Sequence, residues 1–365
     1  MWDLFCQVVD NFGDIGVSWR LARVLRAEQD APIRLWVDDL ASFAVIEPRV
    51  DAAAAVQRID GIEVRRWTDP LPDVEPGEVV IEAFGCRLPD TFLEAMAVRR
   101  PAPVWINLEY LTAEPWAAEC HGLPSPHPRL PLVKHFWFPG FDARTGGVLR
   151  ERGLIEARDA VQAAVRADGA TRVSVFAYDN AAWPELLDAW TRGAGRVDCR
   201  VPEGRAAEAL RRVLGRGVAP GERVERGALA VVVLPFTDQP GYDRLLWSCD
   251  WNFVRGEDSF VRAQLAARPL VWHIYPQEAG AHLAKLEAFL DRYTAGLPDA
   301  ARHAISGLMR AWNGVAGAPA IGDAWAAVEA EAATLQARAR DWAAGLRAGP
   351  ELAAGLARFI RNRLK

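Results

Sequence analysis

The chain has 365 residues, of which 51% are apolar and 25% are charged, and its formal net charge is −5 at pH 7. This composition is that of a globular protein long enough for about two domains, and it excludes collagen, coiled coil or disorder as the main state. A net negative charge without a basic run also argues against direct nucleic-acid binding.

The cysteines and the first residues indicate a cellular compartment. Five cysteines are scattered singly, which favours neither a disulfide framework nor a zinc site and suggests a reducing environment. The chain opens without a basic segment ahead of an apolar run, and it contains no apolar stretch of about 18 residues. We therefore expect a cytoplasmic protein with no membrane segment.

The first half of the chain alternates short apolar runs with segments of helical periodicity. Strands are predicted over 3–9, 33–37, 79–84 and 103–108, and helices over 16–28, 41–47 and 89–99. Such alternation is typical of a parallel sheet with helices on both faces.

The second half repeats this pattern after a glycine-containing segment, 139–170. Strands are predicted over 171–178, 197–201, 228–236, 251–254 and 270–274, and helices over 183–191, 205–214, 241–248, 258–267 and 281–292. The last part is Ala-rich and helical in periodicity. We predict an α/β protein with domains over 1–152 and 153–335, and C-terminal helices over 336–365 that pack back on the first domain.

The first predicted strand is followed by Asp-Asn-Phe-Gly-Asp-Ile-Gly, residues 10–16. This loop lacks the glycine spacing of a dinucleotide site and the lysine of a phosphate-binding loop. Asp14 lies just before a predicted helix, so it is either an N-cap or a carboxylate base presented at a cleft, and Asp10 is either a plain loop residue or its partner.

A second motif, Arg255-Gly256-Glu257-Asp258-Ser259, follows the strand predicted over 251–254. A helix beginning at Asp258 or Ser259 would offer free N–H groups to an anion, and Arg255 could pair with a phosphate. The alternative is a capped helix with a local Arg–carboxylate pair.

Three further strand-end loops carry polar or aromatic side chains. Phe176 and Tyr178 could stack on a nucleobase or pack in the core, and Gln239 could bond a base edge. Tyr275 and Gln277 could bond a ligand, whereas His273 is expected to be a core residue. The sequence contains no Asp-x-Asp and no His-Glu-x-x-His, two motifs of metal-dependent enzymes.

Several of these blocks resemble the bacterial protein-arginine rhamnosyltransferases that modify elongation factor P. The similar segments run in the family's order from residue 2 to about residue 290, and they are residues 2–17, 107–111, 136–138, 255–264 and 272–277. The resemblance implies a GT-B fold, in which two Rossmann-like domains face each other across a cleft. It also implies that no metal and no cofactor are required.

The implied reaction is transfer of L-rhamnose from dTDP-β-L-rhamnose to an arginine of elongation factor P, with inversion, which activates that factor for translation. By resemblance, Asp14 is the general base, and Asp10 and Glu257 are further essential carboxylates. The residues implied to bind the donor are Asn11, Phe12 and Gly13 at the rhamnose, Tyr178 and Gln239 at the thymidine, and Arg255, Gly256, Asp258, Ser259 and Tyr275 at the ribose and diphosphate. We also predict Phe176 as a donor-binding residue, since its ring could stack on the nucleobase.

Two other functions remain open from the residues alone. A nucleotide-sugar epimerase of the same architecture would need no protein acceptor. A non-catalytic binder of a translation factor would use tryptophan-rich surfaces, but it would not need carboxylates in strand-end loops.

Overall fold

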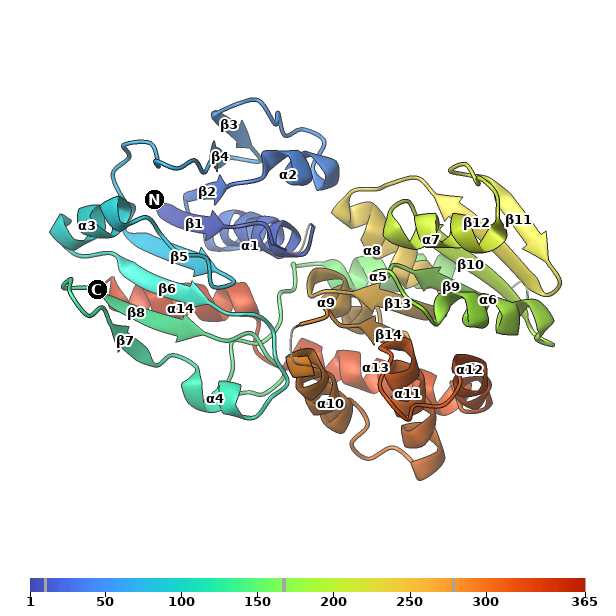
Figure 1. The fold of residues 1–365 in the computed structure, drawn as a ribbon. Helices are drawn as coiled ribbons and strands as arrows, with labels where there is room; N and C mark the ends of the chain where they lie inside the picture. Colours follow the sequence, from blue (N-terminus) through green and yellow to red (C-terminus); the bar gives the residue numbers. More distant parts are fainter. Residues whose placement is uncertain (10–11, 166–168, 278–279, 365) are drawn as a thin grey trace. The chain divides into compact units, whose positions relative to one another are not determined.

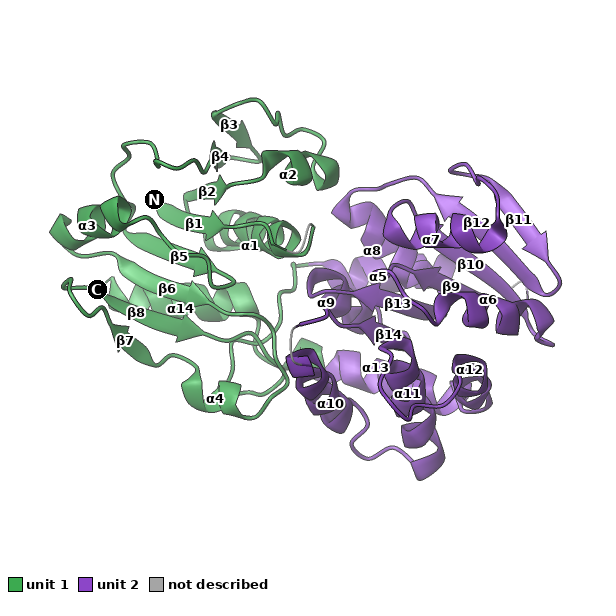
Figure 2. Ribbon diagram, in the orientation of Figure 1, with its two compact units in different colours: residues 1–152, 346–365 green, residues 153–345 purple. Residues whose placement is uncertain are grey.

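The computed structural model describes residues 1–9, 12–165, 169–277 and 280–364 (Figure 1). The chain forms two compact units, residues 1–152 with 346–365 and residues 153–345 (Figure 2). The last helix of the chain therefore belongs to the same unit as its first strand.

Unit 1 is built on an eight-stranded sheet of order β3-β4-β2-β1-β5-β6-β8-β7, whose central strands are parallel. Its strands are β1 (Trp2–Cys6), β2 (Ile33–Val37), β3 (Val56–Ile59), β4 (Ile62–Arg66), β5 (Val79–Ala83), β6 (Val104–Leu108), β7 (Pro124–Pro126) and β8 (Val133–Trp137). Its helices are α1 (Gly13–Gln29), α2 (Leu40–Ile46), α3 (Asp90–Val98), α4 (Trp116–Cys120) and α14 (Leu352–Arg363).

Apolar side chains cover both faces of this sheet. Every residue of β1, β2, β5 and β6 is buried, as expected for parallel strands between helices. One core cluster joins the sheet to α1, α2 and α14, and the other joins it to α3 through Phe92 and Met96. The C-terminal helix contributes Leu352, Leu356 and Ile360 to the first cluster, so unit 1 depends on it for a closed core.

Unit 2 carries a six-stranded sheet of order β11-β12-β10-β9-β13-β14, parallel except for β11. Its strands are β9 (Ala170–Val175), β10 (Arg196–Pro202), β11 (Arg223–Arg226), β12 (Leu229–Leu234), β13 (Trp251–Arg255) and β14 (Leu270–His273). Its helices are α5 (Leu154–Ala164), α6 (Trp183–Arg192), α7 (Arg205–Leu214), α8 (Gln239–Ser248), α9 (Asp258–Leu265), α10 (Ala281–Tyr293), α11 (Asp299–Trp312), α12 (Ile321–Ala330) and α13 (Ala332–Ala348), which runs past the unit boundary.

Each sheet has one point at which the strand order reverses. In unit 1 the chain leaves β1 for β2 on one side and returns to β5 on the other, and in unit 2 it does the same around β9 and β13. Open parallel sheets bind ligands beyond the carboxyl ends of the strands at such a point. The loops after β1 and β5, and after β9 and β13, therefore lie where a ligand is expected in each unit.

The predicted α/β class and the parallel sheets are confirmed, with shifts at several boundaries. The first helix begins at Gly13 instead of residue 16, which places Asp14 in its first turn. The hairpin β3–β4 and strand β8 were not predicted, because their short sequences mix polar and apolar residues. None of the described helices combines the length and the apolar composition that a membrane span requires.

Candidate functional site

The carboxylate of Asp14 is buried at the carboxyl end of β1. Its side chain is 2% exposed. The backbone N–H of Val9 donates to Oδ2 at 2.8 Å, and the hydroxyl of Tyr110 donates to Oδ1 at 3.2 Å. The N-cap position is taken by Phe12, which makes no side-chain cap bond. The interpretation of Asp14 as an N-cap is therefore wrong, and its oxygens are held by groups outside the helix.

The other predicted residues of this loop divide into two groups. Phe12 is partly buried against the main core cluster of unit 1, and Gly13 is the first residue of α1. Asp10 and Asn11 lie outside the described residues. Their predicted roles, as a second carboxylate and as a contact to the sugar, stay predictions.

The second motif forms the turn from β13 into α9 in unit 2. Arg255 ends β13 and is 7% exposed, and Gly256 has a φ of 60°, a left-handed conformation that favours glycine. The indole N–H of Trp272 donates to the Gly256 carbonyl at 2.8 Å, and the Trp272 ring stacks on Phe260 at 3.9 Å. These contacts fix the turn that leads into the first N–H groups of α9.

Ser259 bonds to its own turn in this structure. Its hydroxyl accepts from the Arg255 backbone N–H at 3.1 Å and donates to the Arg255 carbonyl. Glu257 is the N-cap residue of α9 and Asp258 is its first residue, as the sequence predicts. A phosphate at this helix end would meet backbone N–H groups and the helix dipole, and the same turn carries the two acidic residues Glu257 and Asp258.

Aromatic side chains surround the Arg255 guanidinium. Its carbon lies 4.5 Å from the centroid of the Phe176 ring and 4.6 Å from that of Tyr178. The Tyr178 ring meets Tyr275 edge-on at 5.5 Å. Gln239, which is 7% exposed, begins α8 after the loop that follows β12. The structure thus brings Phe176, Tyr178, Arg255 and Tyr275 into one cluster at the reversal point of unit 2.

His273 belongs to the same cluster, although the sequence predicts only a core role for it. It is 6% exposed, and its ring meets Tyr178 edge-on at 5.3 Å. Burial, with smaller contributions from the positive Arg255 and from His282, lowers the pKa of His273 to about 4. The imidazole is therefore neutral at physiological pH, which keeps one extra positive charge out of the arginine site.

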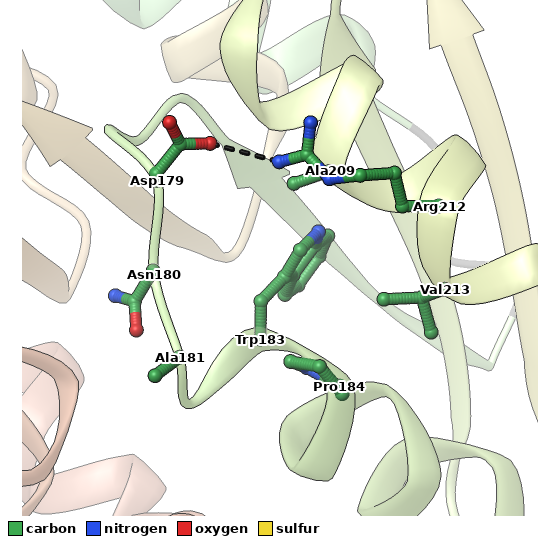
Figure 3. Close-up of a pocket in the computed structure, with 8 residues that line it drawn as sticks. All are labelled: Asp179, Asn180, Ala181, Trp183, Pro184, Ala209, Arg212 and Val213. Atoms are coloured by element: carbon green, nitrogen blue, oxygen red, sulfur yellow. Dashed lines mark hydrogen bonds and ion pairs between the residues drawn. The ribbon is translucent and has the colours of Figure 1, made fainter.

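A separate hollow of about 620 Å³ lies in unit 2 between the loop after β9 and helices α6 and α7 (Figure 3). An exposed ion pair, Asp179–Arg212 at 2.9 Å, spans it, and the Trp183 ring lies beneath. Of the predicted donor-binding residues that the structure describes, none lines this hollow. Among the described residues, no group of three His, Cys, Asp or Glu side chains is arranged to hold a metal ion.

One protein family matches the chain almost from end to end. The model of the family "Elongation-Factor P (EF-P) rhamnosyltransferase EarP" covers residues 2–361. The chain belongs to this family. The resemblance seen in the loop after β1 and in the β13–α9 turn is thereby confirmed.

Curated members of the rhamnosyltransferase family are close relatives in sequence. A protein-arginine rhamnosyltransferase of Pseudomonas putida is 49% identical, over 100% of this chain and 99% of the relative. One of Pseudomonas aeruginosa is 47% identical, over 99% of both. The match extends through both units, including the part beyond residue 290, where the resemblance by sequence blocks is only loose.

Solved structures confirm the GT-B fold class. A structure described as the basis for EarP-mediated arginine glycosylation of translation elongation factor EF-P is 38% identical, with a TM-score of 0.69 over 99% of this chain and 98% of that one. A spinosyn rhamnosyltransferase matches at 15% identity and a TM-score of 0.51, covering 99% and 100% of the two chains, and supports the fold alone.

Proposed function

We propose that this protein transfers L-rhamnose from dTDP-β-L-rhamnose to an arginine side chain of elongation factor P, with inversion at the sugar. The observation that carries the proposal is sequence identity of 47–49% to protein-arginine rhamnosyltransferases over essentially the whole chain. The site residues support it, because buried Asp14 lies at the edge of one sheet where a ligand is expected, and the Arg255 cluster lies at the corresponding edge of the other.

The acceptor sets the chemical problem of the reaction. A guanidinium has a pKa above about 12, so an aspartate cannot remove its proton before attack. As a guanidinium nitrogen bonds to C1 of rhamnose, the bond from C1 to the diphosphate oxygen breaks, and the attacking nitrogen becomes strongly acidic. Asp14 accepts that proton at this late stage. Before this proton transfer, the Asp14 carboxylate aligns the acceptor guanidinium. The orientation of the guanidinium therefore supplies a large part of the rate.

The donor site must stabilise the negative charge that develops on the departing dTDP. The transition state has oxocarbenium character, and negative charge grows on the diphosphate as the sugar leaves. Arg255 and the N–H groups of α9 supply positive potential there, whereas Ser259 supports the turn through its bonds to the Arg255 backbone. Single displacement of this kind needs no covalent intermediate on the enzyme, and we propose that it uses no cofactor beyond the donor.

Intact mass spectrometry of elongation factor P, after incubation with the enzyme and dTDP-rhamnose, tests the proposal. We expect one deoxyhexose increment, located on one arginine-containing peptide. If the enzyme is folded and the donor is intact but elongation factor P stays unmodified, the proposal is refuted. Incubation with donor alone then separates the alternatives, because an epimerase would change the sugar and a non-catalytic binder would leave it intact.

A further inference from the structure

An aromatic side chain from a part of unit 1 that is distant in sequence contacts Asp14. Strands β1, β5 and β6 lie side by side, and their last residues Cys6, Ala83 and Leu108 are in register. The segments that follow them therefore leave the sheet at one edge. Tyr110, two residues beyond β6, donates its hydroxyl to Oδ1 of Asp14 at 3.2 Å.

Phe84 fixes the position of the Tyr110 ring. The two rings stack with centroids 4.9 Å apart and an interplanar angle of 27°. Phe84 has a φ of 58°, a left-handed conformation that costs a bulky residue on the order of 1 kcal/mol. Its backbone N–H donates to the Leu108 carbonyl at 2.8 Å, which ties the loop after β5 to the end of β6. Strain of this kind persists where the surrounding structure requires that side-chain position.

We infer that Tyr110 is a positioning residue for the transfer reaction, held by Phe84, which fixes the orientation of the Asp14 carboxylate toward the acceptor guanidinium. The inference rests on the proposed function. With Oδ2 held by the Val9 N–H and Oδ1 by the Tyr110 hydroxyl, rotation of the carboxylate about its last bond breaks both contacts. Tyr110 donates a hydrogen bond to the carboxylate that serves as the base, so its part is to orient that carboxylate and not to take up the proton.

The two hydrogen bonds to Asp14 fix the plane of its carboxylate before the acceptor arginine arrives. A guanidinium is planar and pairs best with a carboxylate lying in its own plane. A carboxylate that turns freely would reach this plane only part of the time. Loss of the hydroxyl therefore lowers the rate of the bound complex and leaves the Arg255 cluster of the donor site, which lies in unit 2, unchanged.

The test is Tyr110→Phe, which removes the hydroxyl and keeps the ring on Phe84. We expect kcat to fall about 10-fold, as for loss of one long hydrogen bond to a charged group. The KM for dTDP-rhamnose should stay within about twofold, since positioning acts on the transition state and not on donor binding. The matched control is Tyr293→Phe, a buried tyrosine of unit 2 that is outside both predicted sites, and its kinetics should equal those of wild type.

Phe84→Leu provides a second variant, in which the hydroxyl is present but its support is lost. It should lower kcat with the donor KM unchanged, by less than Tyr110→Phe. If wild-type enzyme modifies elongation factor P and both folded variants keep the wild-type kcat, the positioning role is wrong while the proposed function stands. If wild type transfers no sugar, the proposed function itself fails.

Discussion

At the scale of single residues, Asp14 combines deep burial with two hydrogen-bond donors that approach from outside its own helix. A buried carboxylate with such partners is already oriented before a ligand arrives, so its free energy of reorganisation in the reaction is small. Asp14 and the Arg255 cluster lie in different units and different sheets, so the base can be probed independently of the predicted nucleotide end of the donor site.

Asp14→Asn should separate turnover from donor binding. We expect kcat to fall by about 10²- to 10⁴-fold, the usual range for loss of a general base, with donor affinity changed less than about threefold. Steady-state transfer and calorimetric titration with dTDP-rhamnose measure the two quantities. Asp30→Asn, at the exposed far end of the same helix, is the control. Equal losses of turnover and donor affinity in Asp14→Asn would contradict its role as the base.

His273 should make the stability of unit 2 depend on pH. Its pKa of about 4 lies below the value of about 6.5 for an exposed histidine, so between these values the unfolded chain binds a proton that the folded one excludes. Stability is then full above pH 6.5 and falls toward pH 4, by about 3 kcal/mol.

Denaturant unfolding at pH 7 and pH 4.5 measures this effect. The loss of stability between the two pH values should be smaller in His273→Gln than in wild type, by up to that amount. His303→Gln, which changes an exposed histidine, should leave the loss unaltered. A His273 imidazole that titrates near pH 6.5 by NMR would overturn the expectation.

At the scale of secondary-structure elements, a buried ion pair holds α9 against α8. The Arg262 guanidinium donates to both oxygens of Asp243 at 2.9 and 2.8 Å, and both side chains are at most 5% exposed. The pair lies one turn beyond Ser259, so it holds the helix whose first turn is the predicted anion site.

Asp243→Asn should destabilise unit 2 by about 3 kcal/mol, since it removes the Asp243 carboxylate charge that pairs with a buried arginine. Thermal unfolding followed by circular dichroism measures the change, and donor affinity should fall with it. The exposed pair Asp179–Arg212 is the contrast: Asp179→Asn should cost less than about 1 kcal/mol. Equal effects of the two variants would show that burial does not govern the Asp243 pair.

Sequence patterns predicted these elements better than they predicted the contacts between them. A parallel strand such as β12 is a continuous apolar run, and the start of α9 at Asp258 follows a polar turn, so both were predicted. The contact between Tyr110 and Asp14 joins residues 96 positions apart. It depends on the order β1-β5-β6, which no local pattern encodes. The left-handed φ of Phe84 was likewise unpredictable, because glycine is the residue expected at such a conformation.

At the scale of the whole molecule, unit 1 is closed by a helix from the far end of the chain. Leu356 of α14 is fully buried in the core cluster of unit 1. Leu356→Ala should destabilise unit 1 by about 2–5 kcal/mol and leave unit 2 unaffected. Hydrogen exchange followed by peptide mass spectrometry checks this: exchange should rise in peptides of residues 1–152 and stay constant in 205–293. A uniform rise would mean that the two units unfold together.

The return of α14 also fixes an order of events during synthesis of the protein. Domains usually complete their folding in the order in which they leave the ribosome. Here residues 1–152 emerge first but lack α14, so the core face against α1 stays uncovered while all of residues 153–345 are translated. The unit that begins second is therefore the first that can finish folding. In the newly made chain the Arg255 cluster can form while unit 1, which holds Asp14, still waits for its last helix.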